Sequence, residues 1–141
     1  MFGLFKKKAR KAIVEVKKME NRDAVEATVW GCYSIAYADG TCDASEIATL
    51  EKTIQAKPAF SAFAGEIAIM SSNIRAQYEA SPRSANAQAM RELADVADTP
   101  DAVDVLCLCL DVADNDGIGE DEEKQLKKIA QALQLSLDAY I

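Results

Sequence analysis

Histidine is absent from this chain of 141 residues. Its absence excludes zinc sites built on imidazole, nucleophile pairs of the Ser/His and Cys/His kind, and an imidazole general base. Proline and glycine are scarce, with 3 and 6 residues, which argues against disorder and against a turn-rich all-β fold. No apolar run approaches the roughly 18 residues that a membrane span needs. We therefore expect a protein that is not an enzyme and that does not cross a membrane.

The chain start also lacks the features of a secretory signal, because its few apolar residues are followed at once by lysines, with no apolar core and no cleavage site. The cytoplasm is the expected compartment, and thiols stay reduced there. Four cysteines in a chain of this length do not indicate a disulfide framework. Cys32, Cys107 and Cys109 are expected in the core, whereas Cys42 lies in a predicted turn near a helix start, where a thiol is more reactive.

The net charge of -7 combines two opposite parts. Residues 1–22 carry 8 basic and 2 acidic side chains, a balance of +6, and the other 119 residues carry 8 basic and 21 acidic ones, a balance of -13. The acidic part repels nucleic acid, so no nucleic-acid partner is expected. The basic part suits an anionic lipid surface or an acidic protein surface.

Helical periodicity dominates what is present, and no segment alternates as a strand does, so the predicted class is all-α. The pattern predicts a compact bundle of about seven helices. The first falls within residues 1–20, and the others span about 23–38, 43–56, 61–79, 85–97, 101–113 and 120–133. Residues 101–113 are apolar nearly all round, which predicts the central buried helix.

The first predicted helix, residues 1–20, is basic and amphipathic, and we separate it from a helical domain over residues 21–141. Two interpretations stay open for it. One is reversible binding to an anionic membrane surface, and the other is docking on the body with its lysines facing the acidic turns or solvent. The residues expected to contact a membrane or a partner are Phe2, Phe5, Lys6, Lys7, Lys8, Arg10 and Lys11.

An internal repeat relates two segments 77 residues apart. Asp39-Gly40 and Asp116-Gly117 are each followed by five residues and a glutamate, Glu46 or Glu123. Each copy lies between two predicted helices, so the repeat predicts two helix–acidic turn–helix hairpins packed together. This arrangement would bring Cys32 close to Cys109 in the core.

These motifs, Asp39-Gly40-Thr41-Cys42-Asp43-Ala44-Ser45-Glu46 and Asp116-Gly117-Ile118-Gly119-Glu120-Asp121-Glu122-Glu123, resemble the paired Asp-Gly-x5-Glu motifs of the tellurite-resistance TerB family. The resemblance covers roughly residues 23–137. It implies a bundle of about seven helices, two acidic turns side by side with a divalent-metal site, and no established catalysis. It also implies assembly with other tellurite-resistance proteins at the inner face of the cell membrane, including an integral membrane partner.

The acidic turns carry the candidate metal ligands: Asp39, Asp43, Glu46, Asp114, Asp116, Glu120 and Glu123. Carboxylate oxygens suit hard cations, so calcium or magnesium is the expected ion. The alternative is helix punctuation, in which Asp43 and Glu46 form a capping box and the acidic residues after Gly119 favour a helix N-terminus. The two interpretations are compatible, since a capping residue can also be a ligand. In the alternative, the protein is a membrane or protein adaptor without metal.

Overall fold

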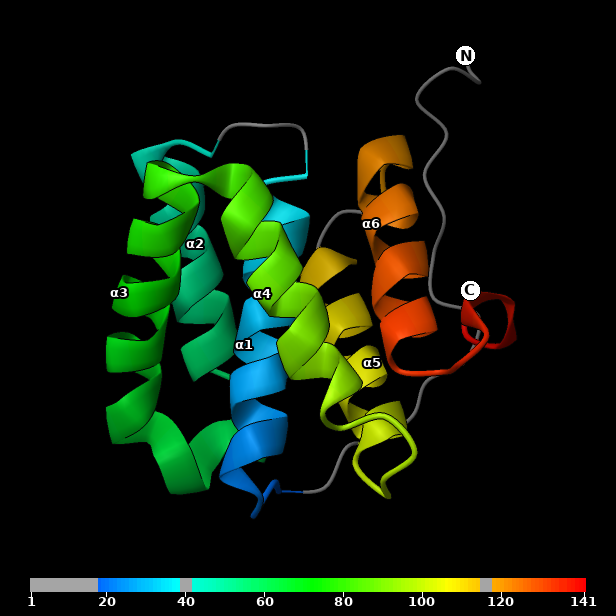
Figure 1. The fold of residues 1–141 in the computed structure, drawn as a ribbon. Coiled ribbons are helices and arrows are strands. Elements are labelled where there is room, and N and C mark those ends of the chain that lie inside the picture. The colour runs from blue at the N-terminus through cyan, green and yellow to red at the C-terminus, as the bar shows by residue number, and fades with distance from the viewer. Residues whose placement is uncertain (1–17, 39–41, 115–117) are drawn as a thin grey trace.

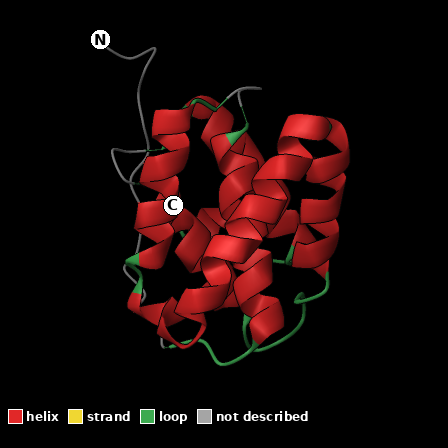
Figure 2. Ribbon diagram, turned by 90° about the vertical axis from the view of Figure 1, so that its left-hand side faces the viewer, coloured by secondary structure: helices red, strands yellow, loops and turns green. Residues whose placement is uncertain are grey.

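The computed structural model describes residues 18–38, 42–114 and 118–141. Over these residues the fold is all-α, as predicted, and Figure 2 shows helices joined by loops. The helices are α1 (Arg22–Ala36), α2 (Ala44–Gln55), α3 (Ala64–Ala80), α4 (Pro82–Ala94), α5 (Ala102–Ala113) and α6 (Glu120–Ala132), with short 3₁₀ helices η1 (Pro58–Phe63) and η2 (Leu137–Ala139). The predicted first helix lies outside the described residues.

Helix α1 is the hub of the bundle, because it packs against every other α-helix (Figure 1). It begins after Asn21, whose side chain accepts a hydrogen bond from the Asp23 amide at 2.9 Å. Every residue from Ala24 to Ile35 is buried except Glu26, so this part of α1 has almost no solvent face. The sequence pattern points to α5 as the central helix. Helix α5 is indeed buried nearly all round, and α1 shares that place with it.

The crossing of α1 and α5 is close because α1 has a glycine at the contact. A Cβ added at Gly31 would lie 2.7 Å from the Cys109 sulfur. Cys109 also donates a hydrogen bond through Sγ to the Thr28 carbonyl, at 3.9 Å. Its thiol pKa is raised by a hydrogen bond with Cys32 and by burial. The predicted proximity of Cys32 and Cys109 is therefore confirmed.

Two helix starts differ from the sequence prediction. The segment after Pro58 forms a 3₁₀ helix before α3 begins at Ala64, so the helix predicted from residue 61 starts later. Helix α4 begins at Pro82, earlier than the predicted residue 85, because Ser81 caps it and proline fits the first helical position. The sequence pattern marks Pro82 only as a break.

The two helix pairs of the predicted repeat are present as α1–α2 and α5–α6. Their first helices end at Ala36 and Ala113, which are 77 residues apart, but their second helices begin at Ala44 and Glu120, which are 76 apart. Similar bounds do not establish that the two pairs superpose, so the internal repeat stays a prediction. The one-residue difference matters for the second turn, as described below.

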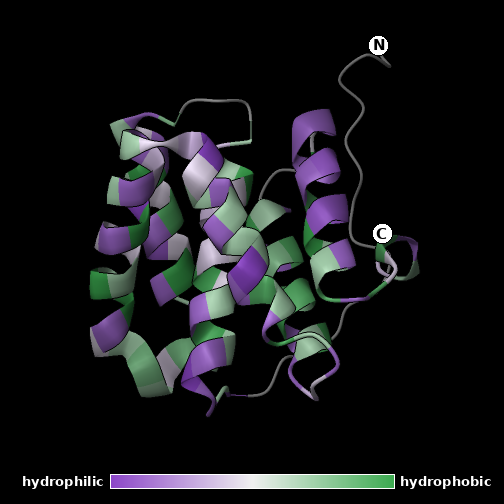
Figure 3. Ribbon diagram, in the orientation of Figure 1, coloured by the Kyte–Doolittle hydropathy of each residue, from purple (hydrophilic) through white to green (hydrophobic). Residues whose placement is uncertain are grey.

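The apolar side chains gather between the helices, and the first turn of α6 is the most polar part of its surface (Figure 3). Among the described residues, no helix combines the length and the apolar character needed to span a bilayer. Ile69 on α3 is the large apolar side chain most open to solvent in this part of the chain, and it is 65% exposed. A single exposed side chain of this kind does not by itself mark an interface.

Candidate functional site

Two of the predicted metal ligands, Asp39 and Asp116, lie outside the described residues, as do all the predicted membrane or partner contacts in residues 2–11. The other five predicted ligands belong to the ends of helices. Asp43 and Glu46 are at the start of α2, Asp114 follows α5, and Glu120 and Glu123 belong to the first turn of α6. The structure thus places them at one end of two helix pairs.

The first turn ends in the capping box that the sequence predicts. Asp43 is the N-cap of α2, and its carboxylate accepts a hydrogen bond from the Glu46 amide at 2.8 Å. The Glu46 carboxylate in turn accepts one from the Asp43 amide at 3.0 Å. Both acidic side chains thereby hold the helix start, and each keeps a further oxygen with lone pairs directed elsewhere.

The second turn uses a different glutamate from the one that the repeat predicts. Gly119 is the N-cap of α6, and its amide donates to the Glu122 carboxylate at 2.8 Å, with no side chain to return the bond. Glu122, absent from the predicted ligands, therefore occupies the place that Glu46 has in α2. Glu123 lies one residue further on and contacts Lys127 at 3.8 Å. A capping-box count from Gly119 finds Glu122 from the sequence alone.

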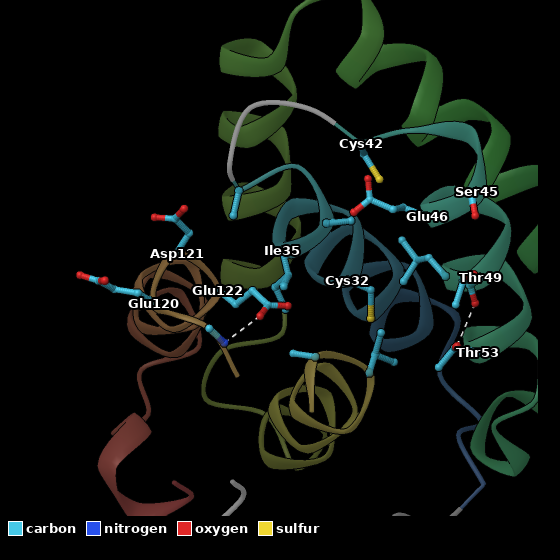
Figure 4. Close-up of a pocket in the computed structure, with 16 residues that line it drawn as sticks. Cys32, Ile35, Cys42, Ser45, Glu46, Thr49, Thr53, Glu120, Asp121 and Glu122 are labelled. Atoms are coloured by element: carbon cyan, nitrogen blue, oxygen red, sulfur yellow. Dashed lines mark hydrogen bonds between the residues drawn. The ribbon is translucent and has the colours of Figure 1, made fainter. Parts of the chain in front are cut away.

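A groove of about 540 Å³ separates the N-terminal ends of α2 and α6. Its floor is apolar and comes from the ends of α1 and α5, including Cys32, Ile35 and Val112. Its two walls carry Glu46 on α2 and the acidic start of α6, as Figure 4 shows. Among the described residues that line it there is no lysine or arginine. The full lining is Cys32, Ile35, Ala36, Ala38, Cys42, Ser45, Glu46, Thr49, Leu50, Thr53, Val112, Ala113, Gly119, Glu120, Asp121 and Glu122.

The carboxylates of the groove do not converge on one point. In Figure 4, Glu122 points toward Ile35, whereas Glu120 and Asp121 point outward, away from Glu46. Within the described residues, no three Asp, Glu, Cys or His side chains are grouped so that they could hold a metal ion. Glu46 and Glu122 are also engaged in capping their own helices. The described residues by themselves therefore do not form a metal-ligand set.

Cys42 is the thiol nearest to the groove opening. It is partly exposed, and in Figure 4 its sulfur lies beside the Glu46 carboxylate. The other thiol that lines the groove, Cys32, is only 1% exposed and belongs to the floor. The sequence prediction of buried Cys32, Cys107 and Cys109 is confirmed.

Aromatic side chains pack behind the first turn. Tyr37, at the end of α1, stacks on Tyr78 of α3 with ring centres 4.7 Å apart, and the Tyr78 hydroxyl donates to Asn86 at 2.7 Å. The sequence pattern predicts a surface position for the Tyr37 hydroxyl. Instead it is buried and makes no hydrogen bond with the described residues, and neither does the buried hydroxyl of Tyr33. Burial raises the pKa of Tyr33 to about 12.

The pairing of two acidic helix starts across one groove agrees with the comparison to protein families. The family described as "Tellurite resistance protein TerB" matches residues 5–141, almost the entire chain. The chain belongs to the TerB family. The match begins at residue 5, so most of the basic N-terminal segment is part of the TerB region. No curated protein and no solved structure matches the chain.

Proposed function

We propose that this TerB chain is a non-catalytic binding module of the tellurite-resistance type, and that the groove between α2 and α6 is its binding site. The observation that carries the proposal is the composition of the groove. An apolar floor lies between two walls whose only charged described residues are acidic: Glu46, Glu120, Asp121 and Glu122. Such a site favours a cationic ligand, or a partner that combines basic and apolar side chains. The sequence offers no histidine for an acid–base or nucleophilic mechanism at this site.

Binding of a divalent cation, calcium or magnesium, by the acidic turns is the first part of this proposal. Its support is the resemblance of the motifs and the gathering of acidic residues at two neighbouring helix starts. The described carboxylates do not suffice, so the proposal depends on Asp39 and Asp116 in addition to them. Calorimetric titration of the full chain with Ca²⁺, Mg²⁺ and Zn²⁺ tests it. We expect a dissociation constant of about 1 mM or lower for at least one of these ions.

The matched variants separate the acidic turns from general surface charge. Asp39→Ala/Asp116→Ala should abolish the calorimetric signal. Glu20→Gln/Asp95→Asn removes the same number of charges at exposed positions outside the groove and should leave the signal unchanged. Absence of a site in the unmodified chain, or equal binding by both variants, contradicts the metal proposal.

The second part of the proposal concerns partners. We propose assembly with other tellurite-resistance proteins, including an integral membrane partner, at the cytoplasmic face of the membrane. The support is family membership together with the basic and apolar composition of residues 2–11. Flotation with vesicles of anionic lipid tests the membrane contact. The full chain should float and a chain lacking residues 1–18 should not, and equal flotation of both contradicts it.

One observation favours a second candidate, an adaptor whose acidic turns only cap helices. Glu46 and Glu122 both accept hydrogen bonds from the N-cap amides of their own helices. Flotation in the presence of a chelator distinguishes the candidates. If removal of divalent cations leaves vesicle binding and partner binding unchanged, while deletion of residues 1–18 abolishes vesicle binding, the adaptor is the better description.

A further inference from the structure

The groove has the shape and polarity of a site for an amphipathic helix. On α2, the residues that face it are Ser45, Glu46, Thr49, Leu50 and Thr53, which form one continuous helical face. Helices α2 and α6 do not pack on each other through their described residues, so this face and the start of α6 are left as opposite walls. Amphipathic helices bind such grooves by placing their apolar face on the floor.

The chain itself contains a segment of complementary charge. Residues 1–17 carry six basic side chains and one acidic side chain, a balance of +5. Their apolar residues, Phe2, Phe5, Ala9, Ile13 and Val16, recur at the helical spacing of three or four. The groove walls carry four carboxylates and, among the described residues, no basic side chain. Charge and apolar pattern thus match on both sides.

The point where this segment leaves the body is at the correct end of the groove. Met19 is buried, and its amide donates to the Ala59 carbonyl at 2.8 Å. Ala59 is in η1, which follows α2 directly and packs against it, so the segment starts beside the C-terminal end of α2. Thr53, which lines the groove, belongs to the same end of α2.

The length of the segment also fits. At 1.5 Å per residue, a helix over residues 2–16 is about 22 Å long, and α2 is about 18 Å long. A helix that runs back along α2 from residue 18 therefore reaches Glu46 with residues to spare. Lys8 is about 15 Å from residue 18 in such a helix, and Glu46 is about 14 Å from the end of α2 at Gln55. The lysine cluster and the acidic walls lie at the same height.

We propose that residues 1–17 of this chain dock as an amphipathic helix in the groove between α2 and α6 of the same molecule, with their lysines facing its acidic walls. The TerB match, which includes residues 5–17, agrees with a segment that is part of the domain. Tethering favours the chain's own segment over a second copy, because a short linker gives an effective concentration near the millimolar range. The inference goes beyond the proposed function and shares its groove with it: a docked segment competes with any external cationic ligand.

Paramagnetic broadening of amide signals tests the docking without any metal. A nitroxide is attached at Phe5→Cys in a Cys42→Ser background, because the remaining cysteines are buried. In dilute protein, we expect the amide signals of residues 45–53 and 119–122 to lose intensity. Lys6→Glu/Lys7→Glu/Lys8→Glu in the labelled chain should restore them. A label at exposed Ala87→Cys on α4, which does not line the groove, serves as the control.

The outcomes are distinct. Loss of these signals within one molecule, reversed by the three glutamates, supports docking. Unchanged signals overturn it. Broadening in a mixture of labelled and isotopically enriched copies, without broadening inside one molecule, also overturns it by assigning the groove to a second copy. Because no metal is added, this experiment can fail while the calorimetric test of cation binding succeeds, and the reverse also holds.

Discussion

The contact between Gly31 and Cys109 gives a sharp test of how the core is built. Replacing Gly31 by alanine adds a Cβ 2.7 Å from the Cys109 sulfur, where ordinary contacts are about 3.5–4.0 Å. The two other neighbours, Leu93 and Ile129, would be at 3.7 and 3.8 Å, which is normal contact. The sulfur therefore accounts for the whole conflict. Overpacking of this kind costs about 1–3 kcal/mol.

Alanine also improves the helix, since glycine inside a helix is about 1 kcal/mol less favourable than alanine. We expect Gly31→Ala to lower the free energy of unfolding by about 1–2 kcal/mol, because the buried sulfur cannot move away freely and the overpacking outweighs the helical gain. In a Cys109→Ala background the conflict is absent, and the same change should stabilise by up to about 1 kcal/mol. The interaction energy between the two positions should then be about 2–3 kcal/mol.

Urea unfolding of the four proteins of this double-mutant cycle, followed by circular dichroism, measures that energy. If Gly31→Ala has the same effect in both backgrounds, the close approach of α1 and α5 does not depend on this glycine, and the packing described for the core is wrong. A stabilising effect in the unmodified background would contradict it equally.

Three further predictions concern single positions. Asp43→Ala removes the N-cap of α2 and should destabilise by about 1 kcal/mol in urea unfolding, whereas Asp43→Ser should cost much less; equal losses would refute the capping role. Gln134 has a φ of 61°, so Gln134→Gly should raise the melting temperature and Gln134→Ala should not; an equal rise with alanine would refute this. The pKa of Tyr33 is raised by burial from 10.0 to about 12, so its contribution to stability is complete below pH 10 and is lost as the pH rises toward 12. Urea midpoints across this range should fall less steeply for Tyr33→Phe, and parallel curves would contradict the assignment.

The helices could be predicted from the sequence because their apolar periodicity and capping residues are local signals. Asp43 followed by Glu46 marked the start of α2, and Pro100 and Gly119 marked the boundaries near α5 and α6. Periodicity could not show that α1 is as buried as α5. Its burial results from being packed against all the other α-helices, which is a tertiary effect that the sequence does not display.

The candidate site was only partly predictable for a similar reason. The repeat at 77 residues correctly pointed to two acidic helix starts, but the second helix begins at an offset of 76, so the repeat selected Glu123 in place of Glu122. Spacing also could not show where side chains point. Glu120 and Asp121 face away from Glu46, so an acidic count over the two turns overstates how many carboxylates meet in the groove.

The central claim is that the groove between α2 and α6 is the binding site of this TerB chain. The most direct measurement is a titration of the isotopically enriched full chain with Ca²⁺ and Mg²⁺, followed through its amide chemical shifts. The claim predicts saturable shifts at residues 42–49 and 119–123, with α3 and α4 unaffected. Shifts that are spread over the surface, that fail to saturate, or that avoid these two helix starts would contradict it.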